Sequence, residues 1–242
     1  MPNETVFVAG NKGWVAKVNL QRPEVVENVR VGNMDIALMR SSDRFMCFGS
    51  ANGDLGILDV RTNQVRTHKL YSNNQQKMLL WDFDVHDYSC YLCATDINDD
   101  GTLRQGSSIL AYDLRIGKAT APVTTAVWPR HVRVVPATCG QKCLVLDQTE
   151  GQYQLISSVA SCWTEKNVCR VSKNCSVPLA LEVSSTGQEV AVVDDTGSVH
   201  VLRSAASAKA RQTWDNAFGA LPSMQVTSTS LFPVLSRTLK VD

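Results

Sequence analysis

The sequence predicts an all-β fold of about five similar β-sheets, and three observations support this prediction. Apolar segments rich in Val, Ile, Leu and Tyr alternate with clusters of Gly, Asn, Asp and Ser along most of the 242 residues. Five segments share one shape, in which an apolar strand, a tight turn and an alternating strand follow one another. Their turn positions are Gly13, Gly53, Ser107, Gly151 and Gly197. These positions lie 40, 54, 44 and 46 residues apart, near the period of roughly 40–45 residues of a β-propeller blade.

The sequence predicts where the hairpin of each repeat lies. The hairpins are expected over residues 6–18, 46–59, 107–113, 143–156 and 190–202. All but the first follow a further apolar segment, at residues 35–39, 81–86, 131–135 and 179–183. The polar insertion 96–105 accounts for the longest interval. Glycine suits the turns because it adopts positive φ without a steric penalty.

The predicted domain organisation is a partial propeller over residues 1–203, followed by a tail or the beginning of a linker over 204–242. The chain opens on the second strand of its first repeat, because no strand is expected before Val6. After residue 203 an Ala/Ser/Lys-rich stretch, Pro222 and Pro233 interrupt the pattern. A blade that lacks a neighbour exposes an apolar face, so we expect the isolated chain to be poorly soluble, to self-associate or to close into an irregular ring.

Charge and composition exclude several classes of function. Lys and Arg number 24 against 23 Asp and Glu, which gives a formal charge of +1 and predicts weak direct binding to nucleic acid. No apolar run approaches about 18 residues, so no transmembrane helix is expected. The first residues lack the pattern of a signal peptide. In that context we interpret the eight cysteines as reduced thiols. They are Cys47, Cys90, Cys93, Cys139, Cys143, Cys162, Cys169 and Cys175.

Two patterns resemble metal sites, and neither is complete. Asp96–Asp100 with Gly101 matches the first half of a calcium loop, but Ser107 stands where a bidentate Glu is needed. We therefore interpret the segment as a solvated insertion. Cys90 and Cys93 have the spacing of half a zinc site, yet on a strand residues three apart point to opposite faces. The remaining cysteines show no four-ligand pattern, so no metal or cofactor residue is assigned.

No catalytic residue is assigned either. Asp195-Thr-Gly197 has the letters of an aspartic-protease half-site, but no second Asp-Thr-Gly exists, and that chemistry requires two carboxylates. The nucleophile pattern Gly-x-Ser-x-Gly is also missing from the sequence, although a Ser–His–Asp arrangement stays open at this level. The four histidines lie on separate repeats, at His68, His86, His131 and His200.

Several segments together resemble one family. The strand ends Asp59-Val-Arg61 and Asp113-Leu-Arg115 resemble the terminal Trp-Asp position of WD repeats. In order, residues 39–62, Asp82–His86 and Tyr112–Arg115 resemble the WD-repeat region of the catalytic subunit of the poly(A)-nuclease (PAN) deadenylation complex. Phe218–Pro222 is similar to the stretch that leaves that propeller.

This resemblance implies a WD-repeat β-propeller of which about five of seven blades are visible, with about two blades missing at the N-terminus. Family members continue into a linker, an inactive ubiquitin-hydrolase-like domain and a DEDD-type exonuclease domain that uses divalent metal. The Asp-x-Glu pair of such nucleases does not occur in this sequence, so the chain is expected to be non-catalytic and to hold no cofactor.

The expected function is a protein-interaction platform that supports poly(A)-tail shortening and mRNA decay. The resemblance implies two partners, the pseudokinase regulatory subunit and mRNA coated with poly(A)-binding protein. It also implies a cytoplasmic location, including P-bodies, and leaves the nucleus open. Two alternatives remain at this level: a WD-repeat scaffold of an unrelated complex, and a propeller hydrolase.

Overall fold

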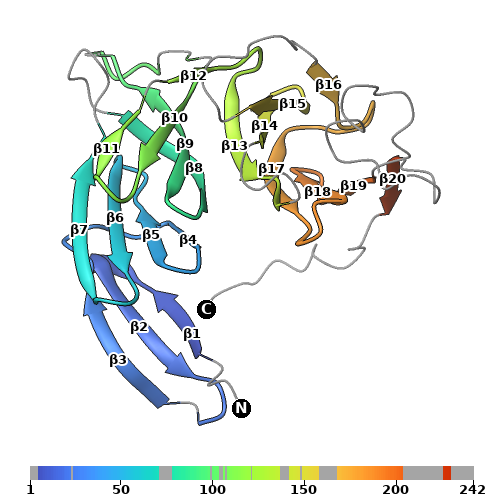
Figure 1. The fold of residues 1–242 in the computed structure, drawn as a ribbon. Coiled ribbons are helices and arrows are strands. Elements are labelled where there is room, and N and C mark those ends of the chain that lie inside the picture. The colour runs from blue at the N-terminus through green and yellow to red at the C-terminus, as the bar shows by residue number, and fades with distance from the viewer. Residues whose placement is uncertain are drawn as a thin grey trace, which may run out of the picture. The chain divides into compact units, whose positions relative to one another are not determined.

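The computed structural model is built almost entirely of β-strands (Figure 1). It describes residues 5–22, 24–70, 78–98, 100–103, 106, 108–120, 122–136, 142–147, 149–157, 168–203 and 226–229. These residues also include a short 3-10 turn, η1 (Asn11–Gly13). No helix in this part of the chain has the length and apolar character needed to cross a membrane. The chain divides into two compact units, Met1–Pro122 and Val123–Asp242.

The first unit contains three antiparallel sheets. The first sheet contains β1 (Thr5–Ala9), β2 (Trp14–Asn19) and β3 (Glu24–Arg30). The second contains β4 (Leu38–Ser41), β5 (Phe45–Gly49), β6 (Asp54–Asp59) and β7 (Gln64–Lys69). The third contains β8 (Met78–His86), β9 (Ser89–Asp96), β10 (Ser108–Asp113) and β11 (Lys118–Ala119).

The second unit contains two further antiparallel sheets. One contains β13 (Pro129–Val134), β14 (Lys142–Asp147), β15 (Gln152–Ser157) and β16 (Val168–Arg170). The other contains β17 (Pro178–Val183), β18 (Glu189–Asp194), β19 (Val199–Arg203) and β20 (Val226–Thr229). The short strand β12 (Val123–Thr124) precedes them. From β1 to β3, β4 to β7, β8 to β11, β13 to β16 and β17 to β20, strands that are consecutive in the chain are hydrogen-bonded neighbours, which is the meander order of a propeller blade.

The predicted strands are confirmed. Strands β4, β8, β13 and β17 precede the hairpins as expected, although β4 begins at Leu38 and not at residue 35. The first sheet starts with β1 at residue 5, and three strands are described in it. The segment predicted as a tail contributes β20, which pairs with β19 from Val199–Thr229 to Leu202–Val226. The pattern did not reveal this strand because Val226–Thr229 contains three hydroxyl residues in four positions.

The same backbone hydrogen bond recurs beside the outer strand of three sheets. The carbonyl oxygen of the turn glycine accepts a bond from the backbone N–H just beyond the outer strand of the same sheet. The pairs are Gly13–Val31 at 2.7 Å, Gly53–Leu70 at 2.8 Å and Gly151–Val171 at 2.8 Å. The three glycines and Gly197 have φ between 60° and 79°, as predicted for four of the five turns. The fifth turn position, Ser107, lies outside the described residues.

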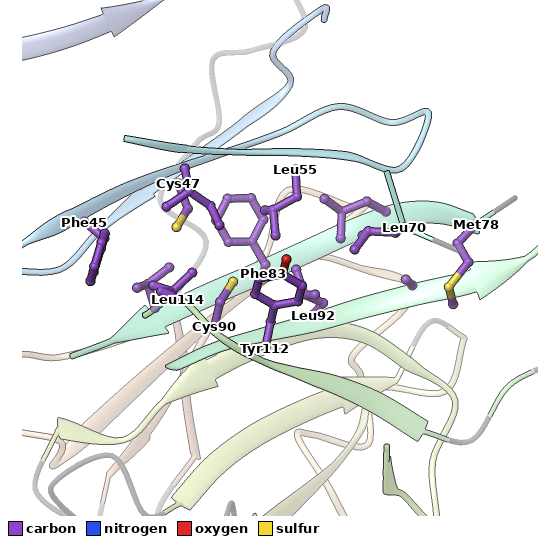
Figure 2. Packing of buried hydrophobic residues seen from close by; sticks show 14 residues of the cluster. Phe45, Cys47, Leu55, Leu70, Met78, Phe83, Cys90, Leu92, Tyr112 and Leu114 are labelled. Atoms are coloured by element: carbon purple, nitrogen blue, oxygen red, sulfur yellow. The ribbon is translucent and has the colours of Figure 1, made fainter. Parts of the chain in front are cut away.

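Buried side chains fill the spaces between neighbouring sheets within each unit. In the first unit, Phe45, Cys47 and Leu55 of the second sheet meet Phe83, Cys90 and Leu92 of the third (Figure 2). A second cluster joins the first and second sheets through Val15, Val31 and Phe48. In the second unit, Leu144, Leu146 and Tyr153 pack with Leu181 and Val192. Each sheet thus contributes apolar residues to the core through its alternating pattern.

The opposite face of the first sheet exposes apolar side chains on β1 and at the beginning of β2. Val6, Val8 and Trp14 have exposed fractions of 40%, 53% and 49%. The register aligns Val6 with Val18 and Val8 with Ala16, so these residues form one face. Contiguous apolar surface of this kind marks a contact face.

We therefore predict that the purified chain self-associates through this face. The replacement Val8→Lys places a charge in the middle of the face and is expected to shift the molar mass measured by light scattering towards the monomer. Ile116→Lys is the control, because Ile116 is exposed to 63% but lies in a turn. A wild-type chain that stays monomeric at high concentration would contradict the prediction.

Candidate functional site

Aspartates at strand ends organise the turns of four sheets. The Oδ1 atoms of Asp59 and Asp113, at the ends of β6 and β10, accept the N–H two residues further on, at 3.0 and 2.8 Å. Asp147 and Asp194, at the ends of β14 and β18, do the same, each at 3.0 Å. This is the Asx turn, in which a side-chain oxygen imitates a backbone carbonyl. The predicted strand-end aspartates therefore have a structural role in shaping loops.

The most elaborate of these turns follows β18. Oδ1 of Asp194 accepts hydrogen bonds from the Thr196 N–H and hydroxyl and from the Ser198 N–H, at 3.0, 2.5 and 3.0 Å. Oδ2 accepts the Ser176 N–H at 3.3 Å and lies 2.9 Å from Nε2 of His200 on β19. Asp194 and His200 are 0% and 1% exposed. Burial alone would raise the pKa of Asp194, but the hydrogen bonds from His200, Thr196 and the backbone outweigh it and hold that pKa well below its usual value.

Cys175 completes this cluster. Its Sγ atom and one ligand atom each from Asp194 and His200 lie within 4.8 Å of one another. Burial, together with the negative charge of Asp194, raises the pKa of the Cys175 thiol to about 11. At neutral pH the sulfur is therefore protonated, whereas nucleophilic attack requires the thiolate.

The cluster does not have the connections of a catalytic triad. In a triad, one imidazole nitrogen contacts the carboxylate and the other contacts the nucleophile. Nδ1 of His200 is buried without a hydrogen-bond partner among the described residues. The carboxylate already accepts five hydrogen bonds. This arrangement therefore holds the β18–β19 hairpin against the segment that precedes β17.

Sequence reasoning considered Cys175, His200 and the Asp195-Thr-Gly197 turn separately and missed their convergence through Asp194. A signal was available in the hairpin itself. A turn that contains Gly197 pairs Val192 with His200, and residues two apart on a strand share a face. Asp194 therefore lies on the face of His200. Asp195, by contrast, is exposed and accepts the Val177 N–H at 3.3 Å.

The insertion after β9 forms a hairpin turn. Asp100 Oδ1 accepts the N–H and the hydroxyl of Thr102 at 2.9 and 2.6 Å, and the Asn98 amide donates to the Thr102 hydroxyl at 2.8 Å. Ile97 and Leu103 form a bridge across the turn. The Asp100 carboxylate is thus directed to Thr102 within the same turn, which supports the interpretation as a solvated insertion. Asp99 and Ser107 lie outside the described residues.

The cysteines that the structure describes form no disulfide with one another. Cys90 and Cys93 both lie on β9, and Cys90 packs beside Cys47 in the core cluster of Figure 2, to which Cys93 does not belong. This agrees with the predicted divergence of the two sulfurs. Burial and contact with Cys47 raise the pKa of the Cys90 thiol. Cys139 and Cys162 lie outside the described residues.

The four histidines lie on four different strands. His68 is on β7, His86 ends β8, His131 is on β13 and His200 is on β19. Burial, together with the charge of Arg66, lowers the pKa of His68. The structure therefore does not assemble the predicted histidines into one site.

Comparisons with known proteins agree on one family. A family described as PAN2 N-terminal matches residues 2–203. The catalytic subunit PAN2 of the PAN2-PAN3 deadenylation complex from Gallus gallus is 27% identical over 201 residues, which are 82% of this chain and 16% of that protein. The Homo sapiens protein of the same description is 23% identical over 199 residues, with the same two shares.

Solved structures show the same fold. The Neurospora crassa Pan2 WD40 domain superposes with a TM-score of 0.67 at 20% identity, covering 84% of this chain and 60% of that chain. The β-propeller domain of Cps50 (Swd1), described as from Myceliophteria thermophila, gives 0.62 at 10% identity, covering 88% and 68%. The predicted all-β, WD-repeat propeller class is thus confirmed. The chain spans about 16% of the length of the curated relatives, and because the family match extends over residues 2–203, it belongs to the PAN2 N-terminal family.

Proposed function

We propose that this chain is a non-catalytic interaction platform of a poly(A)-specific deadenylase subunit. The observation that carries the proposal is the match of residues 2–203 to the PAN2 N-terminal family. The relatives in which this region occurs are named as catalytic subunits of a deadenylation complex. The chain corresponds to about 16% of their length, and it lacks the Asp-x-Glu pair with which a DEDD-type nuclease begins its metal site.

The structure supports a docking role physically. Strand-end aspartates and turn glycines hold the loops of successive sheets through short hydrogen bonds. Loops that are already ordered lose little conformational entropy when a partner binds. Asp194, which lies in a cluster that resembles a reactive site, is used to hold a turn, because its carboxylate accepts five hydrogen bonds.

The proposed partners are the pseudokinase regulatory subunit of the complex and mRNA coated with poly(A)-binding protein. The name of the relatives includes PAN3 as the second component of their complex, which supports the first partner. The proposed location is the cytoplasm, including P-bodies, and the chain is proposed to need no cofactor.

Binding to the partner subunit tests the proposal. The chain and the PAN3-type subunit from the same organism are mixed and measured by isothermal titration calorimetry. Saturable binding is expected. A chain that binds neither this subunit nor poly(A)-binding protein on poly(A) would leave the platform function without support, and an unrelated WD-repeat domain serves as the control protein.

We also predict that the purified chain does not shorten poly(A), with or without Mg²⁺. Direct affinity for poly(A) is expected to be weak. A chain with a formal charge of +1 neutralises few phosphates, so few counterions are released when it binds. Gel analysis of labelled poly(A) measures the activity, and fluorescence anisotropy measures the affinity. Chelator-sensitive shortening from the 3′ end by pure protein would contradict the prediction.

A further inference from the structure

The two faces of the second sheet pack against two different neighbours. Met46, Phe48 and Leu58 lie in a core cluster with residues of the first sheet. Cys47 and Leu55 lie in the cluster that reaches the third sheet (Figure 2). The two sets alternate along β5 and β6 because successive residues of a strand point to opposite faces. We call the side of a sheet towards the preceding sheet its leading face, and the side towards the next sheet its trailing face.

The last sheet, which belongs to the second unit, follows the same rule. Its pair Val190–Leu202 has the place of the pair Met46–Leu58 in the second sheet, because both pairs lie at the same distances from their turn glycine. Val190, Val192 and Leu202 are buried in one cluster with residues of the fourth sheet. The strand register therefore identifies the leading face of a sheet in both units.

The leading face of the first sheet carries exposed valines. Three of its residues lie 40 positions before Met46, Phe48 and Leu58, at Val6, Val8 and Val18. Val6 and Val8 are exposed to 40% and 53%, and Val25, the partner of Val18 on β3, is exposed to 56%. A sheet at the end of a stack of repeats stays soluble when its outer face is polar. Exposed valines on a leading face instead favour contact with another apolar surface.

The trailing face of the last sheet is a second apolar surface. Cross-strand partners form two rows on it, Ala180–Val193–Val199 and Ala191–Val201. Ala180 is exposed, and the other four residues are half-buried. Ala191, Val199 and Val201 have the places of trailing-face residues that are buried against the third sheet in the second sheet. The position of these residues therefore matches that of a surface used for packing between sheets.

The acidic residue Glu182 on this trailing face is compatible with such packing. Glu182 pairs with Ala191 at the β17 end of its row. In the fourth sheet Arg133 pairs with Leu144 in the same way, and Leu144 is buried against the last sheet. Nη2 of Arg133 lies 3.0 Å from Oε1 of Glu182. A charged residue at this position thus does not prevent the contact between two sheets.

We propose that the leading face of the first sheet is a docking site for the trailing face of the last sheet of a second copy of this chain. The contact repeats the packing that joins neighbouring sheets within each unit, where a leading face meets a trailing face. Each copy carries one surface of each kind, so copies associate head to tail. Such a contact is heterologous, and it continues into a ring or a longer row of copies. It does not depend on the proposed platform function.

Two variants that each block one face test the proposal. Val8→Lys places a charge in the leading face of the first sheet, and Ala180→Lys places one in the trailing face of the last sheet. Both side chains are exposed, so the fold should persist, and circular dichroism checks this. Val6→Lys replaces Val8→Lys if that variant does not fold. Each blocked variant alone is expected to lower the self-association constant by about tenfold or more, measured by light scattering.

Mixing the two blocked variants gives the decisive result. The trailing face of Val8→Lys and the leading face of Ala180→Lys are both intact, so an equimolar mixture should form a dimer with one copy of each. Growth should stop at the dimer, because both of its outer faces carry a lysine. Ile116→Lys and Gln188→Lys, which change exposed residues in turns, are the controls and should associate as the wild type does.

Three outcomes would overturn the proposal. The first is a wild-type chain that stays monomeric at high concentration. The second is self-association of Ala180→Lys without a mixed dimer, which would show that two leading faces pair with each other. The third is a mixture that stays monomeric although the wild type associates. If no mixed dimer forms while both variants still bind the PAN3-type subunit, the head-to-tail contact fails and the platform function stands.

Discussion

Replacing Gly53 with alanine is expected to destabilise the first unit by about 2–5 kcal/mol, the sum of backbone strain and overpacking. Gly53 has a φ of 79°, in the left-handed region that disfavours any side chain. A Cβ atom at this position would lie 2.2 Å from the backbone oxygen of Met78. Because the obstacle is backbone at the beginning of β8, it cannot be relieved by rotating a side chain. The midpoint of urea denaturation, followed by circular dichroism, measures the loss.

Gly101→Ala is the matched control for this prediction. Gly101 lies in the same unit and has a φ of 80°, but a Cβ there would meet no atom within 4 Å. Only the strain of positive φ applies, so a loss of about 1 kcal/mol is expected. Equal losses at Gly53 and Gly101 would show that conformation alone, and not the contact with Met78, explains the requirement for glycine at position 53.

Asp194→Asn is expected to destabilise the second unit by about 3 kcal/mol. An amide cannot accept hydrogen bonds at both positions, so its NH₂ group must face one of the donors that now meet Asp194. These donors include the Ser176 N–H at 3.3 Å and His200 Nε2 at 2.9 Å. The site is fully buried, and water cannot compensate. Native-state hydrogen exchange of the β18 and β19 amides measures the effect in this unit.

Asp195→Asn is the control for Asp194→Asn. Asp195 is exposed and accepts the Val177 N–H at 3.3 Å, so the expected change is within about 0.5 kcal/mol. A comparable loss in both variants would argue that charge near the turn, and not the buried network, is responsible.

The effect of Asp194→Asn should depend on pH. The pKa of Asp194 is lowered in the folded protein from its usual value of 3.8, so the unfolded chain takes up the proton first as pH falls. The stabilisation is therefore fully present above about pH 4–5 and is lost progressively below it. The difference in stability between wild type and Asp194→Asn should shrink between neutral and acidic pH. A difference that stays constant over this range would contradict the linkage.

Much of the fold followed from the sequence because its determinants are local. The alternation of apolar and polar residues sets which face of a strand is buried, and the spacing of Gly13, Gly53, Gly151 and Gly197 sets the repeat. Their positive φ values follow from the geometry of a tight turn, which glycine alone adopts at low cost. The structural likeness to the Pan2 WD40 domain confirms the fold class obtained in this way.

Other features depended on contacts between distant residues. β20 joins β19 across a long intervening segment, and its four residues have no strong apolar pattern of their own. The contacts of Tyr88 with Arg44 and Arg115 join three turns, because these residues are 44 and 27 positions apart in the chain. No local sequence motif indicates such contacts.

The sequence by itself determined the repeat, the hairpins and the absence of the Asp-x-Glu pair, since each depends on neighbouring residues. Only the tertiary structure decided what the charged residues do. Asp194 and His200 became a buried network, and Arg44 and Arg115 became an exposed pair around Tyr88. The physical reason is that the energy of a charge depends on its burial and on its partners, and both are set when the sheets pack against one another.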